Sequence, residues 1–423
     1  MSMIRKIAGY SLTLLFIICI SNSLYAQTPD SLSIKIGQMI LIGMPKAEVD
    51  PVVLEEVRQG KAGSIIYFEK NIPKDNSFAE FKKMSWTYQQ AAPIPLFISI
   101  DQEGGKVNRL KEKYGFPRSI TAKAMGKDKM LDSVRFYAGS IAANLAGLGI
   151  NVNFAPCVDL AVNPENTVIV KPERAFSSNE DSVATMAIEY IKQHRKVGVI
   201  TSLKHFPGHG SSKEDTHFGV ADVTNTWSER ELKPYKIIID SGYVDAVMTS
   251  HIVNKTLDKT GLPGTLSKDI LDGILRKKLG FNGVVFSDDM QMHAISKNYG
   301  LEETIKLAIN AGVDIMCFSN NISGSEARTV TKVHEIIRKF VESGEISKVR
   351  IDESFKRIMD LKYKLNHNAD EKYRKELVTA NQRAQMAEQE ARKAVERAAA
   401  SEALAQAQLE AEKNKNKSKK KNK

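Results

Sequence analysis

Residues 198–210 read Gly-Val-Ile-Thr-Ser-Leu-Lys-His-Phe-Pro-Gly-His-Gly, an apolar run that ends in titratable side chains and glycines. The first six residues have the composition of a buried strand, and the Pro-Gly pair that follows breaks regular structure. The loop beyond carries Asp215 and His217, so three of the chain's eight histidines lie within this one span. A surface loop with scattered histidines is the alternative, but titratable groups crowded at a strand end are typical of the catalytic face of an α/β barrel.

Seven further apolar runs are spaced along the chain with room for a helix between neighbours. The eight runs are residues 38–44, 62–68, 95–101, 149–156, 198–205, 245–252, 283–289 and 313–319. Between the runs, apolar residues recur every three or four positions, most clearly at residues 132–148, which predicts amphipathic helices. Strands that alternate with helices pair in parallel, and eight such units predict an α/β fold, the closed (β/α)8 TIM barrel. An open doubly wound sheet is the competing fold, but no glycine-rich phosphate loop follows the first run.

The two ends of the chain differ from this body, which we expect to form a single catalytic domain over residues 27–365. Arg5 and Lys6 precede an apolar stretch that is too short to cross a bilayer comfortably, which predicts a signal peptide over residues 1–26. An uncleaved membrane anchor is the alternative. Residues 366–410 become rich in Ala, Glu, Gln, Lys and Arg, which favours an exposed helix or coiled coil. The protein is therefore expected to be exported, either to the periplasm or out of the cell.

The formal net charge of +11 comes mainly from the two ends. Seven lysines and one glutamate at residues 411–423 contribute +6, and Arg5 and Lys6 contribute +2, which leaves +3 for the rest of the chain. A nearly neutral body argues against a nucleic-acid-binding groove, so no nucleic-acid partner is expected. The lysine-rich end, residues 411–423, is expected to be disordered. It is either a solvated spacer or an electrostatic contact to an anionic component of the cell envelope.

Clustered histidines raise the question of a metal site, which His205, His209 and Asp215 could form in principle. The two histidines flank a Pro-Gly turn instead of sharing one helix face, and the chain has no His-Glu-x-x-His motif. We therefore expect neither a metal nor another cofactor. Cys157 and Cys317 lie in apolar runs and are expected to pack as small hydrophobic residues instead of forming a disulfide.

Two motifs carry a family resemblance. One is Lys-His-Phe-Pro-Gly-His-Gly at residues 204–210, followed by Asp-x-His at residues 215–217; the other is Asp-Gln-Glu-Gly-Gly-Lys-Val-Asn-Arg at residues 101–109. Together they resemble glycoside hydrolase family 3, in its β-N-acetylglucosaminidase branch, over roughly residues 31–365. The chain departs from the family pattern at Lys106, where the family has arginine. Lysine keeps the charge but lacks the planar fork, which puts bidentate contacts at this position in doubt.

The resemblance implies the catalytic residues. It places a carboxylate nucleophile at Asp288, in the run at residues 283–289, where the alternative is that both aspartates cap the following helix, the role we expect for Asp289. It places the proton donor at His217, with Asp215 as its partner. An imidazole titrates near neutral pH, and a carboxylate orients it and stabilises its charged form, so this pair is chemically coherent. For His217 the alternative is a solvent-exposed loop histidine.

The resemblance also implies the ligands of the terminal sugar, which are Asp101, Arg109, Arg174, Lys204 and His205. Ordinary salt bridges at the surface are the alternative for these five residues. His209 and His251 fall near strand ends without an assigned role. Asp159 is expected either to brace a loop or to act in the site.

The resemblance implies a retaining exo-β-N-acetylglucosaminidase that releases N-acetylglucosamine from cell-wall muropeptides or related glycans. Three alternatives stay open. A phosphorylase would share every catalytic residue, and a β-glucosidase of the same family would normally take its acid from a second domain. The third is a non-catalytic wall-binding protein tethered by the lysine-rich end.

Overall fold

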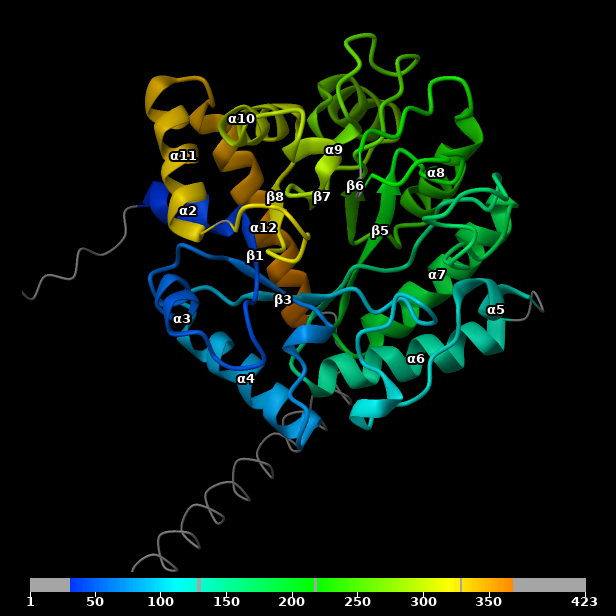
Figure 1. The fold of residues 1–423 in the computed structure, drawn as a ribbon, viewed down its shortest axis with the longest axis horizontal. Helices are drawn as coiled ribbons and strands as arrows, with labels where there is room; N and C mark the ends of the chain where they lie inside the picture. Colours follow the sequence, from blue (N-terminus) through cyan, green and yellow to red (C-terminus); the bar gives the residue numbers. More distant parts are fainter. Residues whose placement is uncertain (1–30, 128–130, 217–218, 328, 368–423) are drawn as a thin grey trace, which may run out of the picture. The chain divides into compact units, whose positions relative to one another are not determined.

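The computed structural model describes residues 31–127, 131–216, 219–327 and 329–367. Eight parallel strands close into one barrel in sequence order, which confirms the predicted (β/α)8 barrel. The strands, seen near the centre of Figure 1, are β1 (Ile40–Gly43), β2 (Ser64–Tyr67), β3 (Phe97–Ile100), β4 (Val152–Asn153), β5 (Ile200–Phe206), β6 (Ala246–Thr249), β7 (Val284–Asp289) and β8 (Ile315–Phe318).

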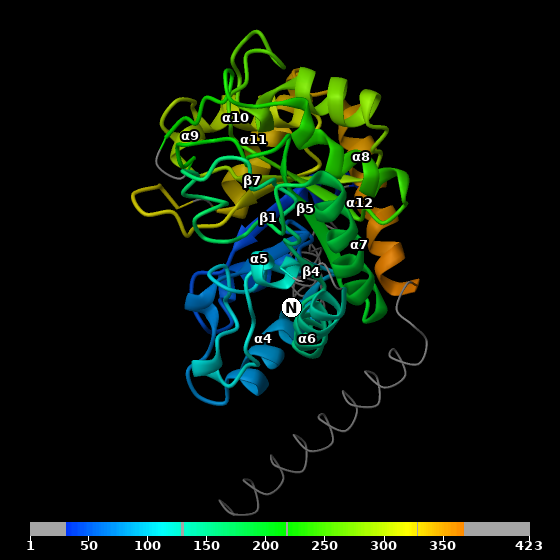
Figure 2. The same ribbon diagram turned by 90° about the vertical axis from the view of Figure 1, so that its right-hand side faces the viewer.

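Helices surround the strands on the outside of the barrel (Figures 1 and 2). They are α2 (Ser31–Gln38), α3 (Pro51–Arg58), α4 (Ser77–Ala91), α5 (Ala122–Gly126), α6 (Leu131–Gly147), α7 (Glu180–Lys196), α8 (Lys233–Asp240), α9 (His293–Ser296), α10 (Leu301–Ala311), α11 (Val330–Ser343) and α12 (Lys348–His367). A π-helix, η5 (Asp269–Lys278), takes the helical position between β6 and β7. The helix predicted at residues 132–148 is α6, one residue earlier at each end.

Helix α7 illustrates how local sequence sets these boundaries. The Asn179 side chain caps it by accepting a hydrogen bond from the Ser182 backbone N–H. Acidic residues occupy its first turn and basic residues its last turn, which is the arrangement that the helix dipole favours. The apolar face of α7 packs beside α6, and Figure 2 shows the two helices side by side.

The barrel interior is filled by large apolar side chains. The ring of Phe286 lies 5.2 Å from that of Phe154 and 6.1 Å from that of Phe97, both in edge-on contacts. Cys157 and Cys317 are both buried free thiols, as predicted from their apolar runs. Searched over the described residues, no helix is long and apolar enough to cross a membrane.

Most strands are shorter than the apolar runs that predicted them. The run at residues 149–156 contributes only Val152 and Asn153 to the ladder. The reason is local: the Ala155 N–H donates back to the Asn153 carbonyl, and the Asn153 side chain bonds to the Gln102 backbone, so the chain turns out of the sheet. In contrast, β5 runs one residue further than predicted, to Phe206.

Two strands lose regular register near their carboxyl ends. The pairing of β5 with β6 shifts between Leu203 and Phe206, and that of β7 with β8 shifts between Phe286 and Asp289. Such irregularities bend a strand and redirect its side chains, and they are common beside active sites. The segments concerned carry Lys204, His205 and Asp288.

All described residues belong to one compact unit. The predicted signal peptide (residues 1–26) and the lysine-rich end lie outside the described residues. Nearly all of the predicted helical tail does as well, although residues 366 and 367 still belong to α12. The predicted domain boundaries therefore stay predictions.

Candidate active site

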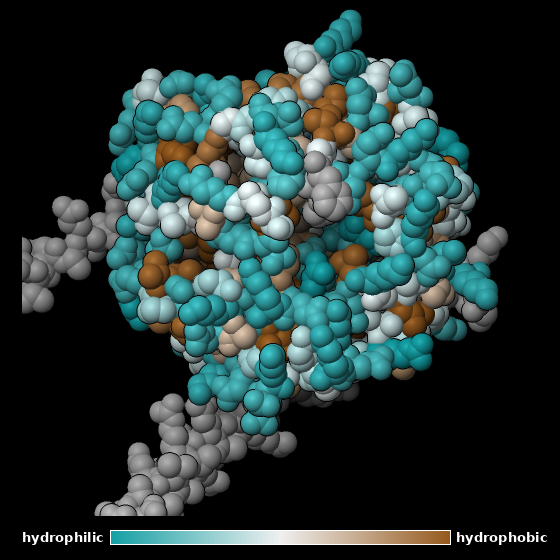
Figure 3. All heavy atoms as spheres, viewed as in Figure 1, coloured by the Kyte–Doolittle hydropathy of each residue, from teal (hydrophilic) through white to brown (hydrophobic). Residues whose placement is uncertain are grey.

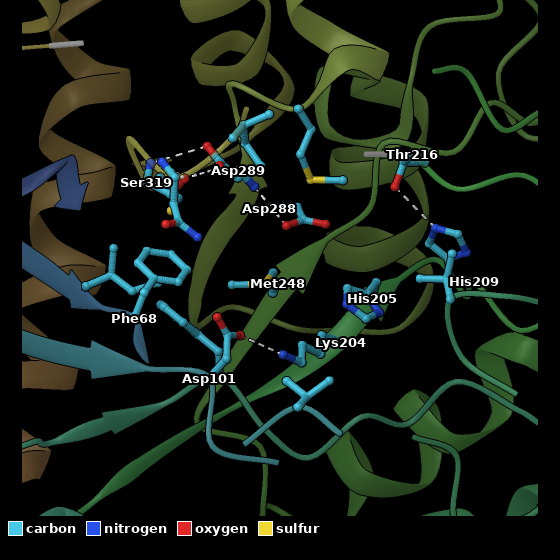
Figure 4. A pocket seen from close by; sticks show the side chains of 18 of the residues that line it. Phe68, Asp101, Lys204, His205, His209, Thr216, Met248, Asp288, Asp289 and Ser319 are labelled. Atoms are coloured by element: carbon cyan, nitrogen blue, oxygen red, sulfur yellow. Dashed lines mark hydrogen bonds and ion pairs between the residues drawn. The ribbon is translucent and has the colours of Figure 1, made fainter. Parts of the chain in front are cut away.

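A cavity of about 320 Å³ opens where the barrel strands end. It is lined by all five side chains predicted to bind the sugar, and by Asp288. Figure 4 shows Asp288 on one side of the cavity and Asp101 with Lys204 on the other, while Met248 lies between them. Figure 3 shows one face of the molecule covered mostly by hydrophilic residues. The cavity, at the ends of the barrel strands, lies on the face where TIM barrels place their active sites.

Lys204 is the centre of a buried ionic cluster. Its side chain is 2% exposed, and its Nζ donates to Asp101 Oδ1 at 2.8 Å and lies 2.7 Å from Glu103 Oε1. Arg109 approaches the other Asp101 oxygen at 3.6 Å. The cluster joins the end of β5 to the end of β3. Because its pairs are buried, it differs from the ordinary salt bridges at the surface that were the alternative for these residues. Burial opposes ionisation of both carboxylates, but the adjacent cations outweigh it and hold the pKa of Asp101 and of Glu103 below their ordinary values.

Arg174 extends this cluster to the loop after β4. Its guanidinium makes a bidentate pair with Glu103, with Nε–Oε2 at 2.9 Å and Nη2–Oε1 at 2.7 Å. Its Nη2 also lies 3.2 Å from His205 Nε2. Because a guanidinium only donates, His205 Nε2 accepts, and the ring hydrogen lies on Nδ1. That nitrogen is 2.6 Å from Asp159 Oδ2.

Asp159 has a defined place in the site, where the sequence left its role open. Besides the His205 ring, it accepts the backbone N–H groups of His205 at 3.2 Å and His209 at 2.8 Å. Burial would raise the pKa of this carboxyl, but His205 and the N–H donors lower it to about 2. Asp159 therefore orients His205 and ties the end of β5 to the loop that follows.

The base of that loop is fixed by buried polar contacts. The Asn166 amide donates to the carbonyls of His209 at 2.7 Å and Gly210 at 3.1 Å, and Glu231 accepts the Gly210 N–H at 2.8 Å. The His209 ring lies 2.6 Å from Ser212 Oγ, and burial lowers the pKa of His209 to about 4. These contacts fix the position of His209 at the cavity wall, which gives a structural place to a residue that had no role assigned from the sequence.

Gly210 is required at this base by close packing. A Cβ there would stand 2.0 Å from the Leu160 carbonyl oxygen. Because any side chain would push the loop away from the barrel, only glycine allows this approach.

Asp288 is held through its backbone at the end of β7. Its N–H donates to Thr249 Oγ1 at 3.2 Å, and its Oδ1 accepts the Asp289 N–H at 2.8 Å. The carboxylate thereby faces the cavity with a defined orientation, as Figure 4 shows. This is the geometry expected of a nucleophile fixed on a strand end.

The expectation that Asp289 caps the following helix is wrong. Strand β7 continues through Asp289, and α9 begins only at His293, with Met292 in the capping position. The Asp289 carboxylate instead bonds to the Ser319 hydroxyl and accepts the Gln291 N–H at 3.1 Å, so it ties the end of β7 to the end of β8. Burial raises the pKa of Asp289 to about 6.

The predicted acid–base pair is described only in part. His217 lies outside the described residues, so its predicted role stays a prediction. Asp215 is partly buried on the same loop. Thr216, between them, is buried and lines the cavity, with its Oγ1 3.4 Å from His209 Nε2 (Figure 4).

Cys157, Asp159 and His205 present ligand atoms within 4.8 Å of one another, which invites comparison with a metal centre. The Asp159–His205 distance of 2.6 Å is that of a direct hydrogen bond, whereas two ligands of one zinc ion stand about 3 Å or more apart. The Arg174 cation also occupies the other side of the His205 ring. The geometry therefore fits a hydrogen-bonded brace and not a shared ion.

Sequence reasoning missed three supporting residues, Glu103, Asn166 and Glu231. Glu103 stands inside the quoted motif at residues 101–109, so its spacing from Asp101 was a usable signal. Asn166 and Glu231 are distant from His209 and Gly210 in the sequence and contact them only in the folded chain, so no local pattern marks them.

Comparisons with known proteins agree with this geometry. The family model described as glycosyl hydrolase family 3 N terminal domain matches residues 31–361. A relative from Tolumonas auensis, named beta-hexosaminidase, is 32% identical over 293 residues, which covers 68% of this chain and 84% of the relative.

Solved structures give the same result. A family 3 β-N-acetylglucosaminidase from Paenibacillus sp. str. FPU-7 has a TM-score of 0.73 and 34% identity; the match covers 81% of this chain but only 64% of that one. A β-N-acetylhexosaminidase from Beutenbergia cavernae has a TM-score of 0.71 and 27% identity, with 79% of this chain and 99% of that chain covered.

The ionic cluster predicts a large and specific loss of stability on removal of its central cation. The substitution Lys204→Met should lower the free energy of unfolding by about 3–5 kcal/mol, because it takes the shared cation from two buried carboxylates and leaves Asp101 with only the more distant Arg109. The loss should shrink as the pH falls, since the carboxyls can then take up a proton. Urea denaturation at several pH values measures both effects.

The matched control is Lys111→Met, which removes a lysine that is 42% exposed and pairs with Glu69. Its expected cost is below about 1 kcal/mol, because solvent screens exposed pairs. Equal small losses in the two variants would contradict the structural importance of the buried cluster.

Proposed function

Because the chain belongs to glycosyl hydrolase family 3, and is therefore a glycoside hydrolase, we propose that it is a retaining exo-β-N-acetylglucosaminidase. One observation carries the proposal: a single cavity sets the Asp288 carboxylate opposite a cluster of fixed charges able to bind sugar hydroxyls. The names of the relatives support the choice of sugar. We place the terminal N-acetylglucosamine in this cavity, with its anomeric carbon toward Asp288.

In the first step, an Asp288 oxygen attacks the anomeric carbon as the bond to the leaving oxygen breaks. The product is a covalent glycosyl-aspartate, and His217 supplies the proton that the leaving oxygen takes up. In the second step, water attacks the same carbon, His217 takes a proton from the water, and Asp288 leaves as a carboxylate. Asp215 orients His217 and stabilises its charged form in this scheme.

The opposite wall fixes the sugar. Ionised Asp101 accepts hydrogen bonds from hydroxyls, and Arg109 and Arg174 donate to them. Lys204 and Glu103 keep these groups charged and in place before the substrate arrives, so little reorganisation is needed during the reaction. Asp101, Arg109, Arg174, Lys204 and His205 together form the proposed subsite for the terminal sugar.

The natural substrate in this proposal is a muropeptide or a related glycan of the cell wall. Export through the predicted signal peptide at residues 1–26 supports it, because such glycans lie outside the cytoplasm. The lysine-rich end at residues 411–423 would hold the enzyme near an anionic envelope component by charge attraction.

The substitution Asp288→Ala tests the nucleophile. Turnover of an aryl β-N-acetylglucosaminide should fall by at least about 10⁴-fold, because removing a residue that forms the covalent intermediate leaves only binding and positioning. Wild type should hydrolyse this substrate and not the matching aryl β-glucoside. Azide should restore release of the aryl alcohol from Asp288→Ala, since it attacks the anomeric carbon from the vacated face and yields an α-glycosyl azide.

The control Asp352→Ala removes an exposed carboxylate of α12 and should keep full activity. Unchanged turnover in Asp288→Ala would remove Asp288 as the nucleophile. Wild type inactive on both substrates would instead favour a non-catalytic wall-binding protein, and a glycosyl phosphate formed in phosphate buffer would identify a phosphorylase.

The substitution His217→Ala tests the acid. Its kcat should fall by about 10²–10⁴-fold on a substrate with a poor leaving group, because that oxygen needs a proton as the bond breaks. The first step on a dinitrophenyl glycoside should change little, since this leaving group departs without help. A plot of rate against leaving-group pKa measures the difference, and equal losses across the series would argue against His217 as the acid.

A further inference from the structure

Three buried polar residues stand beside the end of β7, on the neighbouring strand β6 and the segments that follow it. Thr249 ends β6, His251 follows it, and Thr265 lies in the short helix η4 (Gly264–Leu266). All three side chains have no exposed surface. Of the described residues that line the cavity, Met248 comes from this region, whereas Thr249, His251 and Thr265 are not among them.

The three side chains connect the Asp288 backbone N–H to the Asp289 carbonyl oxygen. The Asp288 N–H donates to Thr249 Oγ1 at 3.2 Å, and Thr249 Oγ1 lies 2.6 Å from Thr265 Oγ1. Thr265 Oγ1 lies 2.8 Å from His251 Nδ1, and His251 Nε2 lies 2.9 Å from the Asp289 carbonyl oxygen. The contacts form a ring that begins and ends on the backbone of residues 288 and 289.

The chemistry of the partners allows one consistent set of hydrogen-bond directions. A carbonyl oxygen only accepts, so His251 Nε2 carries a hydrogen. With the imidazole in this neutral form, Nδ1 accepts from the Thr265 hydroxyl. Thr265 in turn accepts from the Thr249 hydroxyl, and Thr249 accepts from the Asp288 N–H. Each hydrogen in the ring then has an acceptor, and the Thr265 hydroxyl is shared between His251 Nδ1 at 2.8 Å and the Ser250 carbonyl at 3.1 Å.

The loop that carries Thr265 is itself anchored to the segment that follows β6. The Thr265 N–H donates to the Ser250 carbonyl at 3.0 Å, and the Gly264 N–H donates to the Ile252 carbonyl at 2.9 Å. A Cβ on Gly264 would stand 2.9 Å from the Ser250 oxygen, which accounts for a glycine at this crossing. The ring therefore links β6 and the segment after it to the irregular end of β7.

We propose that Thr249, Thr265 and His251 are positioning residues that fix the backbone of Asp288 for attack. This rests on the proposed function, in which Asp288 is the nucleophile. The register of β7 with β8 shifts between Phe286 and Asp289, so the sheet ladder alone does not hold this segment, and the ring replaces the missing support. Because none of the three residues lines the cavity, loss of the ring affects the chemical step and spares sugar binding.

The test compares Thr249→Val with Thr249→Ser. Valine keeps the shape of threonine but removes the hydroxyl, so kcat should fall by about 10- to 100-fold, the penalty for a displaced reacting group. KM should stay within about twofold of wild type, because the groups that bind the sugar are untouched. Serine restores the hydroxyl and should return most of the activity.

The matched control is Thr201→Val. Thr201 is a buried threonine of β5 whose hydroxyl donates to Asp245 at 3.0 Å, away from the cavity. The Thr201→Val variant should lose thermal stability, as Thr249→Val does, but should keep the kcat of the wild type. If Thr249→Val does not fold, Thr265→Val serves in its place, since it opens the ring and leaves Thr249 present.

A double substitution tests the ring as a unit. Thr249→Val with Thr265→Val should be no slower than Thr249→Val alone, because a ring that is already open cannot be opened again. A Thr249→Val variant with wild-type kcat, a serine variant no faster than valine, or additive losses would overturn the proposal. An active Asp288→Ala would overturn the proposed function and this proposal with it, whereas an inactive Asp288→Ala beside a fully active Thr249→Val would overturn the ring alone.

Discussion

The ammonium of Lys204 is buried between two carboxylates, and the rest of the site depends on this interaction. Burying three charges away from water is costly unless each charge has a partner of opposite sign. The pairing of Lys204 with the two carboxylates therefore holds the ends of β3 and β5 together. Arg174 joins through Glu103, and His205 is then oriented between Arg174 and Asp159. A sugar entering the cavity therefore meets charges that the protein has already desolvated and fixed, which is the condition for strong electrostatic recognition.

The other wall of the cavity uses hydrogen bonds instead of ion pairs. At the end of β7, the backbone of Asp288 bonds to Thr249, and its side chain accepts the next N–H. Asp289, one residue later, points to β8 and bonds to Ser319. The two neighbouring aspartates both line the cavity but have different partners, because the Asp288 carboxylate accepts the next backbone N–H, whereas the Asp289 carboxylate is tied to Ser319 beyond β8.

The barrel could be predicted from sequence because it follows from local patterns, whereas the site residues were assigned from the family resemblance and their roles stay predictions. Apolar runs mark the strands, and Asp101, Lys204 and Asp288 each stand at the end of such a run. The supporting contacts could not be predicted in the same way, since Asn166 reaches His209 and Glu231 reaches Gly210 only after folding. The cap expected at Asp289 failed because α9 begins only at His293, and the apolar run at residues 283–289 did not show where the helix would start.

The central claim is that Asp288 forms a covalent bond to the sugar, and trapping that bond tests it most directly. A fluorinated N-acetylglucosaminyl fluoride that reacts quickly and turns over slowly should lose fluoride and leave an ester on Asp288, because the electron-poor sugar resists the second step. Mass spectrometry of proteolytic peptides locates the adduct. The account predicts the added mass on the peptide that contains Asp288 in wild type, and none there in Asp288→Ala. An adduct on another residue, or steady turnover of the reagent without any adduct, would contradict it.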